Sequence, residues 1–405
     1  MRQRLGIPPV GRNRFFVTAM AIDAVGTGVF APVAMLYFLA TTSVGVGRVG
    51  LALSIAAAIA IPMTFVTGLL VDTFGPRPIL LSANAVQALV YLGYPFVHGF
   101  TGIVVATTVA SLGQALFWGS FSPTVAALSR PGEREMWFGF LGALRNVGFA
   151  VGGIASGLVV TIGTPTAFHA IVIVNAVSYA VAFAMLSRER VRRPKPTHEP
   201  THWAIALRDK DYRPLLVNNL AYAVCSLALV YAMPVYAVSV LGLPGWTAGA
   251  IYTVNTVLVG FGQGPAVAAM RGHVRARVTA AGYVAFIVGF GLLAVASAPA
   301  EVIAVGTVLV GVAVYTVGEV MCGPVLSAIA VESRPEAERG RYLSVYQLTW
   351  NLASVIAPGG FGLLLQFNRP SVWLALIAVA AAAGLLALRL PLRLPVAGQV
   401  VTNKA

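Results

Sequence analysis

Three ionisable side chains interrupt long apolar stretches of the sequence. They are Asp23, Arg145 and Glu319. A charge at the middle of a bilayer costs about 3 kcal/mol or more, so it persists only where it faces protein or water. No nucleophile–base motif, metal-ligand cluster or phosphate-binding loop accompanies these residues. They therefore predict the handling of protons or ions, and we expect neither an enzyme nor a metal site.

Asp23 and Arg145 lie at matching positions in their apolar segments. Asp23 follows the start of the run 15–40 by about two helical turns, and Arg145 follows the start of the run 136–162 by slightly more. At a rise of 1.5 Å per residue, both lie about 12–14 Å deep. Each would neutralise the other in a low-dielectric interior, so we predict a buried ion pair. The pair is either functional and dependent on conformation or purely structural, and the sequence leaves both readings open.

Glu319 differs because its own segment contains no basic residue. Its neighbours along one helical face are Tyr315, Gly318 and Cys322. Desolvation without a cationic partner favours the protonated carboxyl, which lets such a group bind and release protons. We expect Glu319 to handle protons or to face a cationic ligand. The alternative is a neutral, hydrogen-bonded structural acid.

The elements that position these residues must be membrane-spanning helices. Of 405 residues, 58% are hydrophobic and 10% are charged, whereas a soluble domain carries about 25% charge. This composition excludes a water-soluble enzyme, a disordered chain and a fibrous protein. Twelve apolar runs have the ~20 residues that a spanning helix needs. They cover residues 15–40, 49–71, 78–98, 102–128, 136–162, 167–187, 214–240, 246–270, 278–298, 301–330, 342–366 and 371–390.

Basic residues predict how these helices are oriented. If both termini are cytoplasmic, nearly all of the 27 Lys and Arg residues fall on the cytoplasmic side. Only Arg48 and Arg369 then lie outside, and Arg145 lies within a span. This bias follows the positive-inside rule, so the net charge of +14 reflects topology and requires no nucleic acid. We expect a multi-pass protein of the bacterial cytoplasmic membrane.

The two halves of the chain resemble copies of each other. Ser129-Arg130-Pro131 before the fifth span matches Ser333-Arg334-Pro335 before the eleventh. We therefore predict an amino-terminal six-helix bundle over 1–187, a cytoplasmic linker over 188–213 and a carboxy-terminal bundle over 214–405. Duplicated six-span halves around a midplane site are a transporter architecture.

A turn motif joins the second and third spans. Gly68 would allow close helix approach, and Asp72 would sit at the membrane surface. Gly75 and Pro76 would form the turn, and Arg77 can pair with the Asp72 carboxylate. The motif is similar to the G-x-x-x-D-x-x-G-x-R signature that the major facilitator superfamily carries at this loop. The resemblance implies a gating role for its glycines, acid and arginine.

The fifth span carries a run of glycines. Gly148, Gly152, Gly153 and Gly157 would form one small-residue helical face on which another helix packs closely. The run resembles the glycine-rich motif in the fifth span of the drug/proton antiporters of that superfamily. Gly153 stands where those antiporters usually have proline.

The resemblance also implies a central cavity between the halves. Its candidate lining residues are aromatic or carry amides, and they are Trp118, Asn218, Asn219, Tyr222, Tyr231, Asn255, Tyr315, Gln347, Trp350 and Asn351. Such groups around one acid suit a lipophilic, often cationic ligand. For any single one of them, packing between helices is the commoner role.

The resemblance covers essentially the whole chain and implies an all-α major facilitator fold of two pseudo-symmetric six-helix bundles. The expected function is proton-coupled efflux of a small lipophilic, drug-like compound by alternating access. Glu319, Asp23 and Arg145 would take part in proton coupling. A proton-coupled importer of a nutrient or metabolite is the alternative. No cofactor besides the proton gradient is expected, and the protein is expected to be a monomer in the lipid bilayer.

Overall fold

The computed structural model describes residues 10–129, 133–189, 204–296, 300–368 and 370–402. Over these ranges the chain is almost entirely helical, apart from turns and two isolated β-bridges. The predicted all-α class is therefore confirmed.

Seven helices make up the first half of the chain. They are α1 (Arg14–Phe30), α2 (Ala34–Thr41), α3 (Val46–Phe74), α4 (Pro76–Gly93), α5 (Gly99–Leu128), α6 (Arg134–Ile162) and α7 (Pro165–Leu186). The 3₁₀ turn Ala31–Val33 contains Pro32 and joins α1 to α2, so these two helices form one span. Proline supplies no N–H to the helical ladder, which accounts for the break.

The second half begins with a short helix and continues through six spans. Its helices are α8 (Ala204–Arg208), α9 (Arg213–Tyr231), α10 (Met233–Val235), α11 (Trp246–Met270), α12 (Arg275–Ala294), α13 (Glu301–Glu332), α14 (Glu336–Phe367) and α15 (Ser371–Arg389). A π-helical turn over Tyr236–Val240 extends α9 and α10 into one span.

Eleven helical segments in the described part are long and apolar enough to cross a membrane. The remaining predicted span, 246–270, forms α11, which has 25 residues but is less apolar. Glycines, threonines and Asn255 interrupt its hydrophobic sequence. Because α11 packs against α6 and α13, Asn255 is enclosed by protein rather than by lipid.

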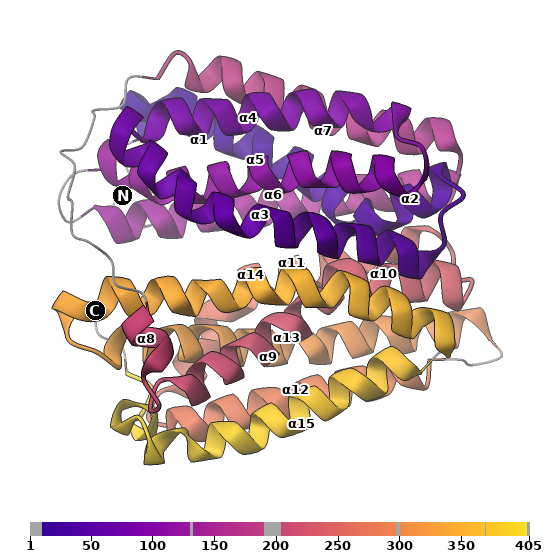
Figure 1. Ribbon diagram of the computed structural model, residues 1–405. Helices are drawn as coiled ribbons and strands as arrows, with labels where there is room; N and C mark the ends of the chain where they lie inside the picture. Colours follow the sequence, from indigo (N-terminus) through magenta and orange to yellow (C-terminus); the bar gives the residue numbers. More distant parts are fainter. Residues whose placement is uncertain (1–9, 130–132, 190–203, 297–299, 369, 403–405) are drawn as a thin grey trace.

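The helices form two bundles, with α1 to α7 in one and α9 to α15 in the other (Figure 1). Both ends of the described chain lie at the same end of the molecule, which we name the terminal side, and the opposite end is the far side. The boundaries predicted at residues 188 and 213 stay a prediction. Of that linker, residues 190–203 lie outside the described residues, and α8 occupies part of the rest.

Two helix pairs join the bundles, and glycines lie at both contacts. α6 packs on α11, and α3 packs on α14. A Cβ atom placed on Gly157 of α6 would lie 3.3 Å from the Gly249 Cα atom of α11. A Cβ atom on Gly362 of α14 would lie 3.3 Å from the Gly50 Cα atom of α3. The two contacts are equivalent in the two halves of the chain, as the sequence repeat predicts. Both contacts lie on the far side.

The glycines of α6 lie on two helical faces, so the prediction of one face is wrong. Gly148 and Gly152 lie against α1, where Gly152 abuts the backbone of Gly28. Gly153 and Gly157 lie against α11. Five residues turn an α-helix by about 140° beyond one full revolution, so Gly148 and Gly153 point to different neighbours. One helix thus holds α1 within its own bundle and α11 across the interface.

We expect Gly249→Ala to lower the thermal midpoint of the purified protein. A Cβ atom there would collide with the backbone of α6 at Gly153 and Gly157. Overpacking of this kind costs about 1–3 kcal/mol. Gly262→Ala, on the same helix with no atom within 4 Å of the new Cβ, is the control and should be neutral or slightly stabilising. Equal midpoints for the two variants would contradict the role of this contact.

Candidate functional site

The structure places Asp23 and Arg145 together, as their predicted depths indicate. Arg145 Nη1 lies 3.6 Å from Asp23 Oδ2, and the side chains are 14% and 3% exposed. Asp23 belongs to α1 and Arg145 to α6, the two helices that the Gly28 and Gly152 backbones bring into contact. The predicted ion pair is therefore confirmed as a contact. Its part in proton coupling stays a prediction.

Aromatic rings surround the guanidinium of Arg145. Its Cζ atom lies 4.7 Å from the ring centroid of Trp118, 5.0 Å from that of Phe149 and 5.7 Å from that of Phe117. Cation–π attraction holds the charge in place and strengthens as water is excluded. Phe117 and Phe149 are not among the residues predicted from the sequence. The spacing of four residues between Arg145 and Phe149 puts both on one helical face and was an available signal.

Glu319 of α13 receives a hydrogen bond from a neighbouring helix. Asn255 Nδ2 of α11 donates to Glu319 Oε2 at 2.5 Å and to Thr316 Oγ1 at 3.0 Å. The Tyr315 hydroxyl donates to the Ser226 carbonyl of α9 at 2.9 Å. No basic residue in the described part of the chain forms an ion pair with Glu319. Its carboxyl is thus held by a neutral amide.

Tyr252 connects the two charged centres across the interface between the bundles. Its ring centroid lies 6.1 Å from that of Phe149, and the Phe149 ring in turn lies 5.0 Å from the Arg145 guanidinium. Asn255, which binds Glu319, follows one turn later on α11. One cation from α6 and one acid from α13 therefore flank the same tyrosine. Tyr252 is not among the residues predicted from the sequence.

The predicted cavity residues separate into two groups. Trp118 is half exposed, and Trp350 is partly exposed and packs edge-on against Tyr222 with ring centroids 5.7 Å apart. Tyr231 is partly exposed and Gln347 is exposed. These residues remain candidates for a cavity lining.

Three other predicted lining residues are enclosed in the carboxy-terminal bundle, where they bind neighbouring helices. Asn218 donates to the Ala383 carbonyl at 2.8 Å, and Asn219 donates to Thr349 Oγ1 at 2.6 Å. Tyr315 is fully buried, as are both asparagines. Their expected role as cavity lining is wrong for this conformation, because each is buried and donates a hydrogen bond to another helix of its own bundle.

Asn351 lies at the second contact between the bundles. Its Nδ2 atom donates to Thr64 Oγ1 of α3 at 3.5 Å. Nearby on the same helix, the Gly359 N–H donates to Ser54 Oγ at 2.8 Å. Asn351 therefore binds across the interface rather than to other groups of its own bundle.

The turn motif after α3 forms, but not with the expected contacts. Gly75 adopts a φ of 88°, which favours glycine, and Pro76 begins α4 directly after it. No ion pair joins the exposed Asp72 to Arg77. Arg77 Nη2 instead donates to the Ser187 carbonyl at 2.7 Å, at the end of α7. The carbonyls that end a helix have no partner within it and attract cations.

Gly68 does not bring two helices close together in this conformation. A Cβ atom there would have no neighbour within 4 Å. That expectation is therefore wrong here, and Gly119 of α5 is the glycine that meets α3, at Thr67. The gating roles predicted for Gly68, Asp72, Gly75 and Arg77 stay predictions.

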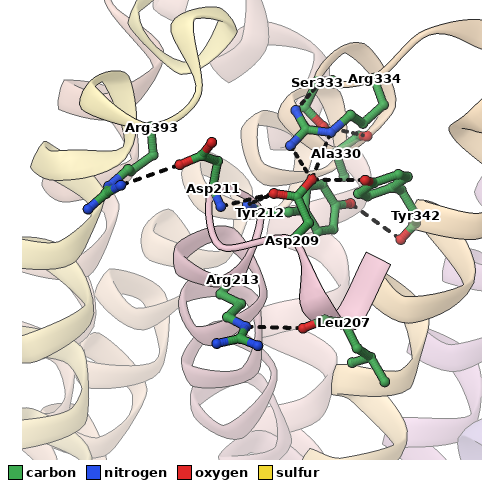
Figure 2. A network of polar contacts seen from close by, with 10 residues as sticks. All are labelled: Leu207, Asp209, Asp211, Tyr212, Arg213, Ala330, Ser333, Arg334, Tyr342 and Arg393. Atoms are coloured by element: carbon green, nitrogen blue, oxygen red, sulfur yellow. Dashed lines mark hydrogen bonds and ion pairs between the residues drawn. The ribbon is translucent and has the colours of Figure 1, made fainter. Parts of the chain in front are cut away.

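A polar network on the terminal side of the second bundle surrounds Asp209 (Figure 2). Asp209 Oδ2 accepts hydrogen bonds from Arg334 Nε at 3.1 Å and from the Tyr342 hydroxyl at 2.8 Å. Its Oδ1 accepts from the backbone N–H groups of Asp211 and Tyr212. The repeated Ser-Arg-Pro sequence before α14 thus supplies a cation that fastens the start of α9. Its counterpart at 130–131 lies outside the described residues.

These hydrogen bonds determine the ionisation of Asp209. Partial burial alone would raise its pKa. The hydrogen bonds from Arg334, Tyr342 and the Asp211 backbone outweigh burial and lower the pKa below the ordinary value of 3.8. The carboxylate is therefore the stable form throughout the physiological range.

The loop between α11 and α12 is the second-half counterpart of the turn motif. It pairs with the end of the described chain, because the Gly272 N–H donates to the Val401 carbonyl at 3.1 Å and the Val401 N–H donates to the His273 carbonyl at 2.9 Å. Arg275 Nη1 lies 2.9 Å from Glu332 Oε2 at the end of α13. Backbone pairing and one ion pair therefore fasten this loop.

Comparison with known proteins supports the observed fold and identifies the protein family whose sequences this chain resembles. Residues 16–358 match the sequence model of the Major Facilitator Superfamily. The tetracycline resistance protein, class G, of Vibrio anguillarum is 28% identical over 185 residues. These residues cover 41% of this chain and 43% of that relative, so the match spans less than half of either protein.

Solved structures show the same fold at low sequence identity. The nucleoside transporter NupG has a TM-score of 0.74 at 11% identity, over 95% of this chain and 99% of that chain. The D-xylose-proton symporter has a TM-score of 0.74 at 14% identity, over 93% and 97%. A bacterial homologue of the iron transporter ferroportin in an inward-facing state has a TM-score of 0.68 at 16% identity, over 97% and 100%. These likenesses show the fold alone.

We expect substitutions of the Asp23–Arg145 pair to be strongly non-additive. Arg145→Gln leaves a buried carboxylate without its cation, which costs about 3–5 kcal/mol. Asp23→Asn leaves the opposite charge unpaired, and the double variant should recover part of the loss. The measurement is denaturant unfolding of the purified protein. Arg393→Gln removes an exposed pair with Asp211 and, as control, should cost less than about 1 kcal/mol. Strict additivity would mean that the buried pair contributes nothing.

We expect Asp209 to stabilise the protein in a pH-dependent way. An aspartate whose pKa is lowered on folding stabilises the fold above 3.8, and this contribution is lost as the pH falls from 3.8 towards the lowered value. Asp209→Asn should reduce the thermal midpoint by about 2–4 °C at pH 7, and the difference from wild type should shrink below pH 3.8. Asp211→Asn, an exposed neighbour, is the control. A difference that stays constant with pH would contradict this role.

Proposed function

This chain belongs to the major facilitator superfamily, and on that premise we propose that it exports small lipophilic compounds in exchange for protons. It is a multi-pass membrane transporter of that superfamily. The direction of transport, the coupling ion and the substrate class form the proposal. The proposed location is the bacterial cytoplasmic membrane, with both termini cytoplasmic.

The observation that carries the proposal is the setting of Glu319. Its carboxyl lies between α11 and α13, is bound by the Asn255 amide and has no ion-pair partner in the described part of the chain. A carboxyl held by a neutral donor can be protonated without leaving a buried cation unpaired. Asp23 differs, because protonating it would leave the Arg145 cation without an anionic partner. Glu319 is therefore the acid that we assign to proton binding and release.

The proposed substrate site lies where the bundles meet beside Tyr252. The amino-terminal bundle contributes Arg145 with the half-exposed Trp118 ring, and the other bundle contributes Glu319 with Asn255. Rings provide apolar contact area, and the charged and amide groups provide orientation. This combination suits a lipophilic compound that carries a cationic group, because the carboxylate form of Glu319 can pair with it.

The contacts between the bundles are consistent with a state that is closed on the far side. The Gly157–Gly249 and Gly50–Gly362 contacts both lie there. With the termini in the cytoplasm, the far side faces outward. In the proposed cycle Glu319 receives a proton when the far side opens and releases it when the terminal side opens. The free carboxylate then accepts the compound to be exported.

The relative with the tetracycline resistance function supports export, but only across part of the chain. The importer hypothesis rests on the fold alone. The decisive experiment therefore measures direction and proton dependence together in reconstituted vesicles.

We expect Glu319→Gln to reduce transport driven by a pH gradient by about ten-fold or more, because glutamine cannot release a proton. The assay follows a cationic hydrophobic dye in proteoliposomes, with dye exchange at equal pH as second readout. Exchange should persist in the variant, since it requires no net proton movement.

Glu301→Gln, at the exposed start of the same helix, is the matched control. Unchanged pH dependence in Glu319→Gln would remove Glu319 from the mechanism. Proton-driven accumulation of a labelled sugar or nucleoside by wild type would replace export with import.

A further inference from the structure

Thr316 lies about one helical turn before Glu319 on α13 and binds the same amide. The Nδ2 atom of Asn255 carries two hydrogen atoms, and it donates to Glu319 Oε2 at 2.5 Å and to Thr316 Oγ1 at 3.0 Å. Thr316 and Asn255 are buried, whereas Glu319 is partly exposed. Thr316 is therefore joined, through one shared amide, to the acid that we assign to proton binding.

A backbone carbonyl fixes the orientation of the Thr316 hydroxyl. Thr316 Oγ1 donates its single hydrogen atom to the Val312 carbonyl at 2.7 Å, one turn earlier on α13. Serines and threonines within helices often bond the carbonyl four residues before them. Because that hydrogen atom is already used, the hydroxyl oxygen offers lone pairs to α11. It can accept a hydrogen bond from Asn255 but cannot donate one.

The oriented hydroxyl in turn determines which end of the Asn255 amide faces Glu319. The nitrogen and the oxygen of such an amide are told apart by the hydrogen bonds that each can make. A flipped amide would turn its oxygen towards Thr316 and Glu319. Thr316 would then have to give up its bond to Val312, or two acceptors would face each other. The amide therefore presents its nitrogen to the carboxyl.

A hydrogen-bond donor favours the carboxylate over the protonated acid. Hydrogen bonds to an ionised acceptor are roughly twice as strong as those between neutral groups. A protonated Glu319 instead carries an O–H group that needs an acceptor, and a flipped Asn255 amide would supply one. Because Thr316 opposes that flip, it also opposes protonation of Glu319.

The neighbouring helices bring no charged side chain to the level of Glu319 in the described part of the chain. α11 contains none, and those of α9, α12 and α14 lie within the first two turns, at the terminal side. On α13 itself the nearest charged residue is Glu332, about 20 Å further along the helix. The charge of Glu319 is therefore governed by its neutral polar neighbours.

The other titratable groups around Glu319 are tyrosines and thiols. They are Tyr222 and Cys225 of α9, Tyr252 of α11, and Tyr315 and Cys322 of α13. Such side chains are uncharged at acidic and neutral pH. The hydroxyls of Tyr315 and Ser226 also lie near the carboxyl, and Tyr315 directs its hydrogen atom to the Ser226 carbonyl. None of these groups depends on Thr316 for its orientation.

We propose that Thr316 is a positioning residue for the release of a proton from Glu319. It keeps the nitrogen of the Asn255 amide towards Glu319, which favours the carboxylate and lets the proton leave when the terminal side opens. The inference rests on the proposed role of Glu319 in proton coupling. It does not depend on which compound is transported.

The test is an infrared titration of the purified protein, in which the carboxyl band that disappears in Glu319→Gln reports protonation of Glu319. In Thr316→Val, the amide can turn its oxygen to a protonated Glu319 without breaking another hydrogen bond. The pH of half-protonation should therefore rise by about 0.5–1 unit, because proton affinity increases by roughly three- to ten-fold. Thr316→Ser keeps the hydroxyl and, as matched control, should titrate like wild type. An unchanged midpoint in Thr316→Val, or an equal rise in Thr316→Ser, would overturn the proposal.

A double variant tests whether Thr316 acts through Asn255. Asn255→Leu removes the amide and should raise the pH of half-protonation at least as far as Thr316→Val does. Adding Thr316→Val to Asn255→Leu should then cause no further rise. A further rise would mean that Thr316 acts on Glu319 by another route, which contradicts the proposal. Should Thr316→Val fail to fold, Thr316→Ala gives the same comparison.

This proposal and the proposed function fail in different measurements, because the titration requires no transport. Equal titration of wild type and Thr316→Val, together with loss of pH-driven transport in Glu319→Gln, would overturn the role of Thr316 alone. A shifted titration in Thr316→Val, together with unchanged pH dependence of transport in Glu319→Gln, would overturn the proposed function instead.

Discussion

Removal of charged and polar groups from water is the constraint on which the interior of this protein depends. In the amino-terminal bundle, Asp23 is neutralised by Arg145, whose charge is in turn enclosed by aromatic rings. In the carboxy-terminal bundle, Glu319 is bound by the Asn255 amide instead of a cation. The two acids therefore have different chemistry. Protonating Glu319 neutralises a carboxylate that has no cationic partner. Protonating Asp23 would instead leave the Arg145 cation without its anionic partner.

Close backbone contact determines where these groups meet. Glycines on α6 allow α1 to pack closely on one face and α11 on another. The helix α6 therefore carries Arg145, contacts α1, which carries Asp23, and contacts α11, whose Asn255 binds Glu319. The α3–α14 contact repeats the α6–α11 contact with a second pair of glycines. Small residues are suited to this because helices in lipid associate through packing rather than through the hydrophobic effect. In the proposed cycle, both contacts separate when the far side opens.

Polar contacts on the terminal side fasten helices within each bundle. Arg77 binds the end of α7, and Arg334 binds Asp209 beside the start of α9. The loop between α11 and α12 pairs with the end of the described chain. Each contact lies within one half, so these networks stiffen the bundles without joining them. Rigid halves that move against each other are the usual basis of alternating access.

The sequence alone determined the membrane setting, the helical spans, the duplicated halves and the Asp23–Arg145 contact. These features follow from composition, from a repeat and from the regular rise of a helix, which are properties of the chain that need no knowledge of neighbours. Only the tertiary structure decided which side of each helix faces which neighbour. It placed Asn218 and Tyr315 inside a bundle, directed Arg77 to Ser187 and brought the Tyr252 ring against Phe149 beside Arg145. Rotation of a helix about its axis and its packing partner depend on close contacts between segments distant in sequence, and periodicity alone does not encode them.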